Sequence, residues 1–258
     1  MSLVSAVKYI SRLRWSSPLV FDLMQRFGSL YTNRDTTVMR GVARGLRFNT
    51  GRAHNAGFIF GTYEPEVQQL YAETLKPGMV VYDVGAHVGF LAVLAARLVG
   101  ASGHVVCFEP LPDNQEALAH NVELNAFDQV TLIRAALGDN EGTAALAIGA
   151  DVGWGRLGDG GDAAISVRVH RLSEAGALYA LPKPDVIKID IEGGETAMLA
   201  GAEDFIQRHR PRLFIELHGT NQDVKRFLDR MRYSARILGS DADILSAHWN
   251  AFVVAVPE

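Results

Sequence analysis

The sequence VVYDVGAHVGFLAVLAARLVG, residues 80–100, decides the fold. A short apolar run over residues 79–83 predicts a buried strand, and residues 88–99 predict an apolar helix. Between them lie Gly85 and Gly89, and glycine lets the backbone turn sharply and approach a ligand closely. A helix that begins at this turn points unpaired N–H groups toward the same ligand. The stretch therefore predicts a strand–turn–helix unit with a binding site at the turn.

Strands and helices continue to alternate after this unit. The further strands are expected at 104–108, 130–137, 185–189, 211–217, 235–238 and 251–256, and the helices at 113–125, 195–209 and 222–232. This alternation predicts an α/β fold, a Rossmann-like, seven-stranded, mostly parallel sheet with helices on both faces. The Gly-rich residues 140–170 are expected to hold short strands and loops. Ligands of such sheets bind beyond the carboxyl ends of the strands.

The chain before this sheet has a different pattern. Residues 2–31 have helical spacing, broken at Ser16-Ser17-Pro18, and residues 36–51 predict a short hairpin. A helix over 64–75 then leads into the first strand. We therefore divide the chain into an N-terminal extension of helices and a hairpin, 1–62, and a sheet domain, 63–258.

Composition narrows the class of protein. The 258 residues are 48% hydrophobic and 21% charged, as in ordinary globular proteins. Cys107 is the single cysteine, so no intrachain disulfide forms. No stretch has the length and apolarity of a membrane span, and no signal peptide is visible, so we expect a cytoplasmic protein.

Charge is spread unevenly along the chain. Residues 1–47 hold eight basic and two acidic residues, a net charge of +6, which leaves −10 for the remainder. The basic segment is either the solvated face of a docking helix or a contact to phosphate, a membrane surface or an acidic partner. The acidic remainder disfavours broad nucleic-acid binding. Apolar positions in the first helices could also form a homodimer face.

Glu109 follows the second strand, 20 residues after Gly89. An acid at this place accepts both hydroxyls of a ribose, so the glycine turn and Glu109 together indicate nucleoside binding. The alternative for Glu109 is a capping or surface role. The turn reads G-x-x-x-G rather than G-x-G-x-x-G, and His87 adds bulk where a pyrophosphate needs close approach, which disfavours NAD.

Acidic residues and a histidine follow the fourth and fifth strands. Asp190 and Glu192 come after the fourth, while Glu216 and His218 share one face at the end of the fifth. If the two strands are neighbours, these side chains converge. They could serve as a general base or hold a divalent cation. Glu195 opens a helix, where its charge suits the helix dipole, and its role could be purely structural.

Two segments together resemble the FkbM-type subfamily of class I S-adenosylmethionine-dependent methyltransferases. They are VVYDVGAHVGFLAVLAARLVGASGHVVCFEPLPDNQEALAHNVELN, residues 80–125, and DVIKIDIEGGETAMLAGAEDFIQRHRPRLFIELHG, residues 185–219. The run GTYEPEVQQLYAETLKPG, residues 61–78, also fits. The resemblance implies S-adenosylmethionine as cofactor, with S-adenosylhomocysteine as product. It covers residues 58–256 and departs from the family pattern at Arg134, where an asparagine is frequent.

The resemblance also implies roles for individual residues. The methionine part of the cofactor would lie on the first motif, and Asp190 would lie next to the methyl donor. Glu109 would bind the ribose, Leu111, Ala136 and Leu137 would border the adenine, and Tyr63 and Glu64 would close over the cofactor. The residues of the first motif are Asp83, Gly85, Ala86, His87 and Gly89.

We therefore expect methyl transfer to a hydroxyl of a small molecule such as a sugar, polyketide or other secondary metabolite. The catalytic candidates are Asp190, Glu216 and His218, and the same three residues are the ligands if a divalent cation is used instead. The other interpretations are a membrane- or partner-binding module with a cofactor-sensing pocket and, less favoured, a nucleotide-dependent oxidoreductase.

Overall fold

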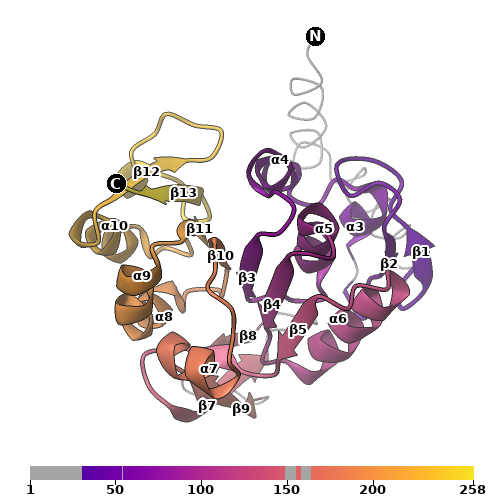
Figure 1. Ribbon diagram of the computed structural model, residues 1–258, viewed down its shortest axis with the longest axis horizontal. Helices are drawn as coiled ribbons and strands as arrows, with labels where there is room; N and C mark the ends of the chain where they lie inside the picture. The colour runs from indigo at the N-terminus through magenta and orange to yellow at the C-terminus, as the bar shows by residue number, and fades with distance from the viewer. Residues whose placement is uncertain (1–30, 54, 149–154, 158–163) are drawn as a thin grey trace.

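A seven-stranded sheet forms the centre of the computed structural model, which describes residues 31–53, 55–148, 155–157 and 164–258 (Figure 1). The strand order is β12-β13-β11-β10-β3-β4-β5, and β13 runs antiparallel to both of its neighbours while the other pairs are parallel. The expected sheet is therefore confirmed. Its strands are β3 (Val80–Val84), β4 (His104–Phe108), β5 (Val130–Ile133), β10 (Val186–Ile189), β11 (Arg212–Glu216), β12 (Tyr233–Ile237) and β13 (Phe252–Pro257).

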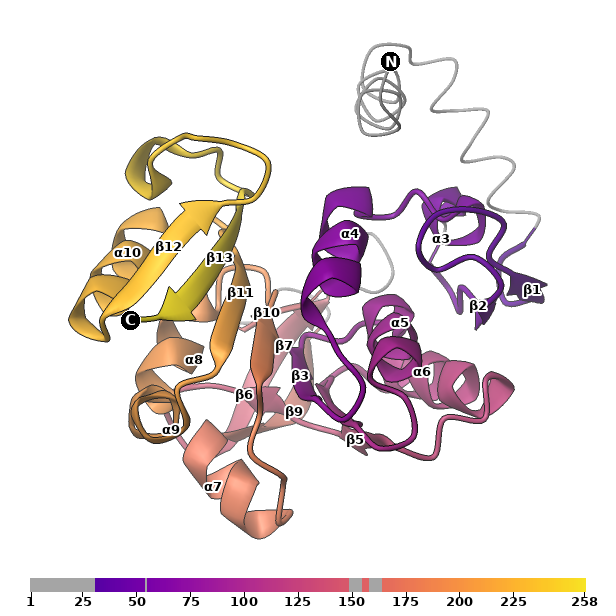
Figure 2. The same ribbon diagram turned by 45° about the horizontal axis from the view of Figure 1, so that its top comes forward.

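Helices cover both faces of the sheet (Figures 1 and 2). One face packs against α4 (Pro65–Thr74), α5 (Phe90–Val99) and α6 (Pro112–Leu124) in a cluster that contains Tyr71, Leu94 and Leu118. The other packs against α7 (Leu172–Leu178), α8 (Glu195–Gly201), α9 (Glu203–His209) and α10 (Asn221–Arg230). Burial of apolar side chains in these two layers is the main term that stabilises the fold.

The turn between β3 and α5 depends on its glycines. Gly85 has φ +79°, and a Cβ added there would lie 1.9 Å from the carbonyl oxygen of Asp190. Gly85 therefore permits the end of β3 to lie against the residue that follows β10. Gly89 has φ +86° immediately before α5 begins. Every residue of α5 except Arg97 and Leu98 is buried, which explains why its sequence is apolar nearly all round.

Two expected elements are divided in the structure. The strand expected over 130–137 was wrong as one element, because β5 ends at Ile133 and β6 (Ala136–Leu137) pairs with β9 (Ala164–His170) in a second sheet. Because β5 is the edge strand of the central sheet, no strand among the described residues pairs with its outer side, and the chain can leave the sheet after Ile133. The helix expected over 195–209 is also two helices, and α8 ends at Gly201, where a Cβ would lie 1.9 Å from the carbonyl oxygen of Gly138.

The second sheet has the order β6-β9-β7-β8. It confirms short strands in the Gly-rich region, with β7 (Gly142–Ile148) and β8 (Gly155–Leu157) completing it. Short helices α3 (Ala56–Phe60) and α7 were not expected from the sequence. A 3-10 turn, η1 (Ile244–Ser246), lies between β12 and β13.

The expected hairpin is present as β1 (Asp35–Thr37) and β2 (Arg47–Asn49), which pair antiparallel. Asn121 of α6 anchors it. The Asn49 N–H donates to Asn121 Oδ1 at 2.6 Å, and Asn121 Nδ2 donates to the carbonyls of Asn49 and Val88 at 2.8 Å each. One buried side chain thus ties the hairpin to the glycine turn. The helices expected over 2–31 lie outside the described residues, so the division at residue 62 stays a prediction.

Among the described residues, no helix combines the length and the apolar character that crossing a membrane requires.

Candidate active site

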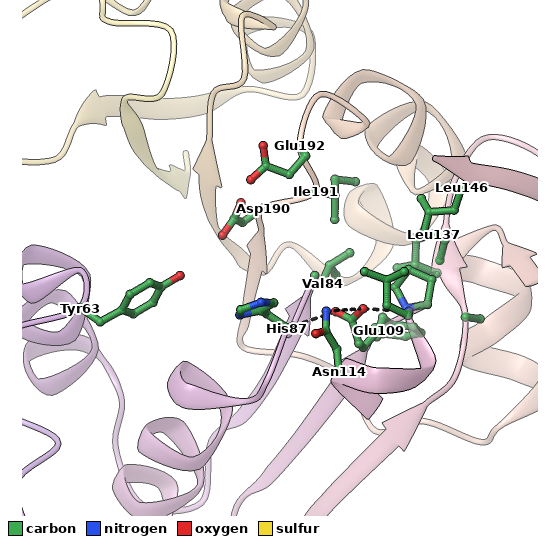
Figure 3. A pocket seen from close by; sticks show the side chains of 16 residues that line it. Tyr63, Val84, His87, Glu109, Asn114, Leu137, Leu146, Asp190, Ile191 and Glu192 are labelled. Atoms are coloured by element: carbon green, nitrogen blue, oxygen red, sulfur yellow. Dashed lines mark hydrogen bonds between the residues drawn. The ribbon is translucent and has the colours of Figure 1, made fainter. Parts of the chain in front are cut away.

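A pocket lies at the carboxyl ends of β3, β4 and β10 (Figure 3). It is a hollow of about 720 Å³, counting the part open to solvent. Polar groups line one end and apolar side chains the other. The lining residues are Tyr63, Val84, Gly85, His87, Phe108, Glu109, Pro110, Leu111, Asn114, Ala135, Ala136, Leu137, Leu146, Asp190, Ile191 and Glu192.

Glu109 is held in this pocket by three donors. Its Oε2 accepts from the His87 N–H at 2.8 Å, and its Oε1 accepts from the Leu111 N–H at 2.9 Å and from Asn114 Nδ2 at 3.2 Å. The side chain is 4% exposed, and burial raises its pKa to about 7, although the hydrogen bonds from Leu111, His87 and Asn114 oppose this rise. The glycine turn therefore supplies a backbone donor that fixes the carboxylate 22 residues away in sequence.

The apolar end of the pocket lies beyond Glu109. Leu137 and Leu146 stand there, on the far side of the pocket from Tyr63 (Figure 3). Leu137 belongs to β6 and Leu146 to β7, so the second sheet builds this wall. A flat apolar ring system suits such a wall, with its polar sugar directed back to Glu109.

Asp190 lines the opposite end together with Glu192 (Figure 3). Beneath it lies Lys188, whose Nζ is 3.3 Å from Asp190 Oδ2 and 3.1 Å from Asp83 Oδ1 and donates to the Gly85 carbonyl at 3.0 Å. Burial lowers the pKa of Lys188, but the charges of Asp83 and Asp190 outweigh it and raise that pKa well above its usual value. Lys188 is therefore a charged residue that fixes the ends of β3 and β10.

His218 stands among four carboxylates. Its Nδ1 donates to Glu195 Oε1 at 2.9 Å, and its Nε2 lies 3.5 Å from Glu192 Oε2, 3.8 Å from Asp190 Oδ1 and 4.0 Å from Glu216 Oε1. Burial lowers the pKa of His218, yet the hydrogen bond to Glu195 and the nearby acids together raise it to about 9. Burial raises the pKa of Glu216 to about 8, and the charges of Asp190 and Glu64 add to that rise.

Tyr63 and Glu64 approach from the segment before α4. Tyr63 lines the pocket, and its ring packs on Phe58 and Phe90 with centroids 4.4 and 5.6 Å away. Glu64 precedes α4 with φ +42° and does not line the pocket. Burial raises the pKa of Glu64 to about 7, and the charge of Asp190 contributes.

The structure brings most of the predicted residues together. On the pocket wall it places Tyr63, Gly85, His87, Glu109, Leu111, Ala136, Leu137 and Asp190. It does not place Asp83 there, because that carboxylate is buried against Lys188, nor Glu64, Ala86 and Gly89. Glu216 and His218 are not on this wall either, but they meet Asp190 beside it.

Sequence reasoning missed several contributors. Asn114 and Leu146 line the pocket, and Glu195 holds His218. Asn114 lies in the first turn of the helix after Glu109, which is a usable signal. Leu146 has none, because its place depends on the second sheet.

A sheet of this order with a pocket at its carboxyl edge is the arrangement expected from the resemblance to class I S-adenosylmethionine-dependent methyltransferases. Residues 83–239 match the family described as the methyltransferase FkbM domain. The chain therefore belongs to the FkbM-type methyltransferases, as the resemblance predicted.

Several known proteins are similar to parts of this chain. The chain is 28% identical over 186 residues to the hexuronic acid methyltransferase AglP of Haloferax volcanii, covering 70% of this chain and 75% of that protein. It is 29% identical over 110 residues to protein-L-isoaspartate O-methyltransferase 2 of Arabidopsis thaliana, covering 39% of this chain and 36% of that protein. The crystal structure of methyltransferase FkbM from Methylobacillus flagellatus KT aligns with a TM-score of 0.49 at 18% identity, covering 73% of this chain and half, 50%, of that one.

Proposed function

We propose that this protein methylates a hydroxyl oxygen of a small molecule, with a sugar as the favoured class of acceptor. One observation carries the proposal: a single pocket has the buried carboxylate of Glu109 on one wall and the carboxylates of Asp190 and Glu192 on another. A nucleoside-linked methyl donor needs a carboxylate such as Glu109 for its ribose, and a hydroxyl that loses its proton needs an acceptor such as Asp190 or Glu192. The sugar class is supported by the relative that is named a hexuronic acid methyltransferase.

The residues present fit S-adenosylmethionine. Glu109 accepts the two ribose hydroxyls through the lone pairs that its three donors leave free. Leu111, Leu137 and Leu146 cover the adenine, and Gly85 and His87 border the methionine part. The cofactor supplies an electrophilic methyl group on a sulfonium when it is bound.

The chain itself orients the acceptor and takes its proton. Asp190 and Glu192 line the pocket as carboxylates, which accept hydrogen bonds from a hydroxyl and hold its oxygen toward the methyl group. A carboxylate of this pair removes the proton as the oxygen is alkylated. Lys188 fixes Asp190 from below, so the carboxylate does not need to reorganise.

Calorimetric titration tests the cofactor half of the proposal. S-adenosylmethionine and S-adenosylhomocysteine are expected to bind to the wild type, and NAD is not. Glu109→Ala is expected to abolish the binding of S-adenosylmethionine and S-adenosylhomocysteine. Binding of NAD alone would support the oxidoreductase interpretation and sink the proposal.

Transfer of a labelled methyl group to a panel of sugars and polyketide alcohols tests the acceptor half. Asp190→Asn is expected to bind S-adenosylhomocysteine as the wild type does and to lose turnover. Product in which the label sits on nitrogen or carbon would reject the oxygen acceptor.

The remaining expectations stay predictions. They are a cytoplasmic location, no nucleic-acid partner, and a membrane contact or homodimer through the basic N-terminal segment. Centrifugation with anionic vesicles and light scattering would test the last two.

A further inference from the structure

Two neighbouring parallel strands bring an acidic and histidine cluster to one edge of the sheet. In the pairing of β10 with β11, Ile189 lies opposite Ile215, so Asp190 and Glu216 follow at equivalent positions. His218 comes two residues after Glu216. One oxygen from each acid and one ring nitrogen of His218 all lie within 4.8 Å of one another.

The second ring nitrogen of His218 is directed into this cluster. The His218 side chain is 7% exposed, and its Nε2 makes no hydrogen bond to any residue that the structure describes. Carboxylate oxygens of Glu192, Asp190 and Glu216 surround it at 3.5, 3.8 and 4.0 Å. When Nε2 gives up its proton, this nitrogen and the carboxylate oxygens around it converge as a ligand set for a cation.

Glu195 fixes which nitrogen faces the cluster. It is 0% exposed, and its Oε1 accepts from His218 Nδ1 at 2.9 Å and from the Gly193 N–H at 3.1 Å. Its Oε2 accepts from Thr220 Oγ1 at 3.3 Å. A carboxylate bound to one imidazole nitrogen, with the other nitrogen toward a metal, is the usual outer support of a metal-binding histidine.

We propose that Asp190, Glu216 and His218 bind one divalent cation, of the Mg²⁺ and Mn²⁺ class, at the acceptor end of the pocket. Two carboxylates favour a hard cation, and the single imidazole favours Mn²⁺ over Mg²⁺. Within the described residues, Lys188 is the other cation in ion-pair contact with Asp190, and it is already shared with Asp83 and Gly85. A divalent ion would balance negative charge of these carboxylates that Lys188 and His218 leave uncompensated.

The role of this ion rests on the proposed function, although its binding does not. The acceptor oxygen would coordinate the ion, which lowers the pKa of the hydroxyl. The proton passes to Glu192, which lines the pocket and is outside the ligand set. The bond from oxygen to the methyl carbon forms as the carbon–sulfur bond breaks, and the electron pair of that bond stays on sulfur.

Binding of Mn²⁺ to the chelator-treated full chain, followed by electron paramagnetic resonance, tests the site directly. The wild type is expected to bind one Mn²⁺ per chain. Glu216→Gln and His218→Gln are each expected to weaken binding at least about tenfold, and Glu195→Gln about 10- to 100-fold, which is the usual cost of losing outer support. Circular dichroism of each variant establishes that it is folded, and either ligand variant alone is sufficient for the test.

Glu141→Gln is the matched control. Glu141 also pairs with a histidine, since its Oε2 lies 2.8 Å from His170 Nδ1, but away from this cluster. This variant is expected to bind Mn²⁺ like the wild type. The absence of a saturable Mn²⁺ site in the wild type would overturn the proposal. So would folded Glu216→Gln and His218→Gln variants that bind Mn²⁺ as tightly as the wild type.

Two further measurements separate this inference from the proposed function. If the wild type binds S-adenosylmethionine and transfers methyl at an unchanged rate after removal of divalent ions, the role of the ion in the reaction is wrong, while the methyltransferase proposal stands and the metal site itself is decided by the Mn²⁺ titration. If Mn²⁺ binds at the cluster but S-adenosylmethionine does not bind, the metal site stands and the proposed function is wrong.

Discussion

Glu109 should make the binding of S-adenosylmethionine depend on pH. Burial raises the pKa of this carboxyl to about 7 in the free protein. Two ribose hydroxyls require an acceptor, and a protonated carboxyl presents an O–H in place of one. The ionised fraction falls from about nine-tenths at pH 8 to about one-tenth at pH 6, so the apparent Kd should rise about tenfold. Loss of hydration lowers the pKa of half-buried His87 to about 4, so this neighbour stays neutral over the same range.

Glu109→Gln is the matched variant, because it keeps the shape of the side chain and does not titrate. At pH 8 it should bind about 10- to 100-fold more weakly, which corresponds to one lost charged hydrogen bond of about 1.5–3 kcal/mol. Calorimetric titration of both proteins at pH 6, 7 and 8 gives the ratio of their Kd values, in which all other titrating groups cancel. The advantage of the wild type should shrink about tenfold from pH 8 to pH 6. Parallel pH curves, or equal affinity at pH 8, would refute the role of Glu109.

Three further changes test the fold around the site. Because the pKa of Glu109 is raised from 4.5 to about 7, the native state binds more protons than the unfolded state between these values, so stability falls as pH rises through that window. In urea unfolding, the wild type should lose about 2–3 kcal/mol relative to Glu109→Gln between pH 5 and pH 8, and no relative change would contradict the buried charge. Gly85→Ala should lower the free energy of unfolding by about 1–3 kcal/mol more than Gly100→Ala, because both glycines have positive φ but only Gly85 lies against the Asp190 carbonyl. Equal unfolding midpoints in the two variants would show that the contact relaxes freely. Lys188→Met should lower the unfolding free energy by about 3–5 kcal/mol because it leaves Asp83 and Asp190 without their shared cation. The control Lys183→Met, at an exposed lysine, should leave the urea midpoint unchanged. A similar midpoint in both variants would argue against a stabilising contact of Lys188 with the two aspartates.

The sequence by itself determined the features that short-range patterns encode. The apolar run before Gly85 and the apolar helix after Gly89 predict the strand, the turn and the buried helix, because strand and helix periods and glycine conformations are local properties. The place of Glu109 also follows from the sequence, since parallel strands bring their carboxyl ends to one edge. The same rule correctly brought Asp190 and His218 together.

Only the tertiary structure decided how distant side chains share these places. Asp83 stands at a strand end, as expected, yet its carboxylate pairs with Lys188 of the neighbouring strand β10 and does not line the pocket. Leu146 reaches the pocket only because the second sheet forms, and the expected strand over 130–137 divides so that β6 can join that sheet. Glu195 looked like a helix-opening residue, but it orients His218, which lies 23 residues later. Such contacts depend on the packing of segments far apart in the chain, and the period of a single segment carries no information about which buried partner it will meet.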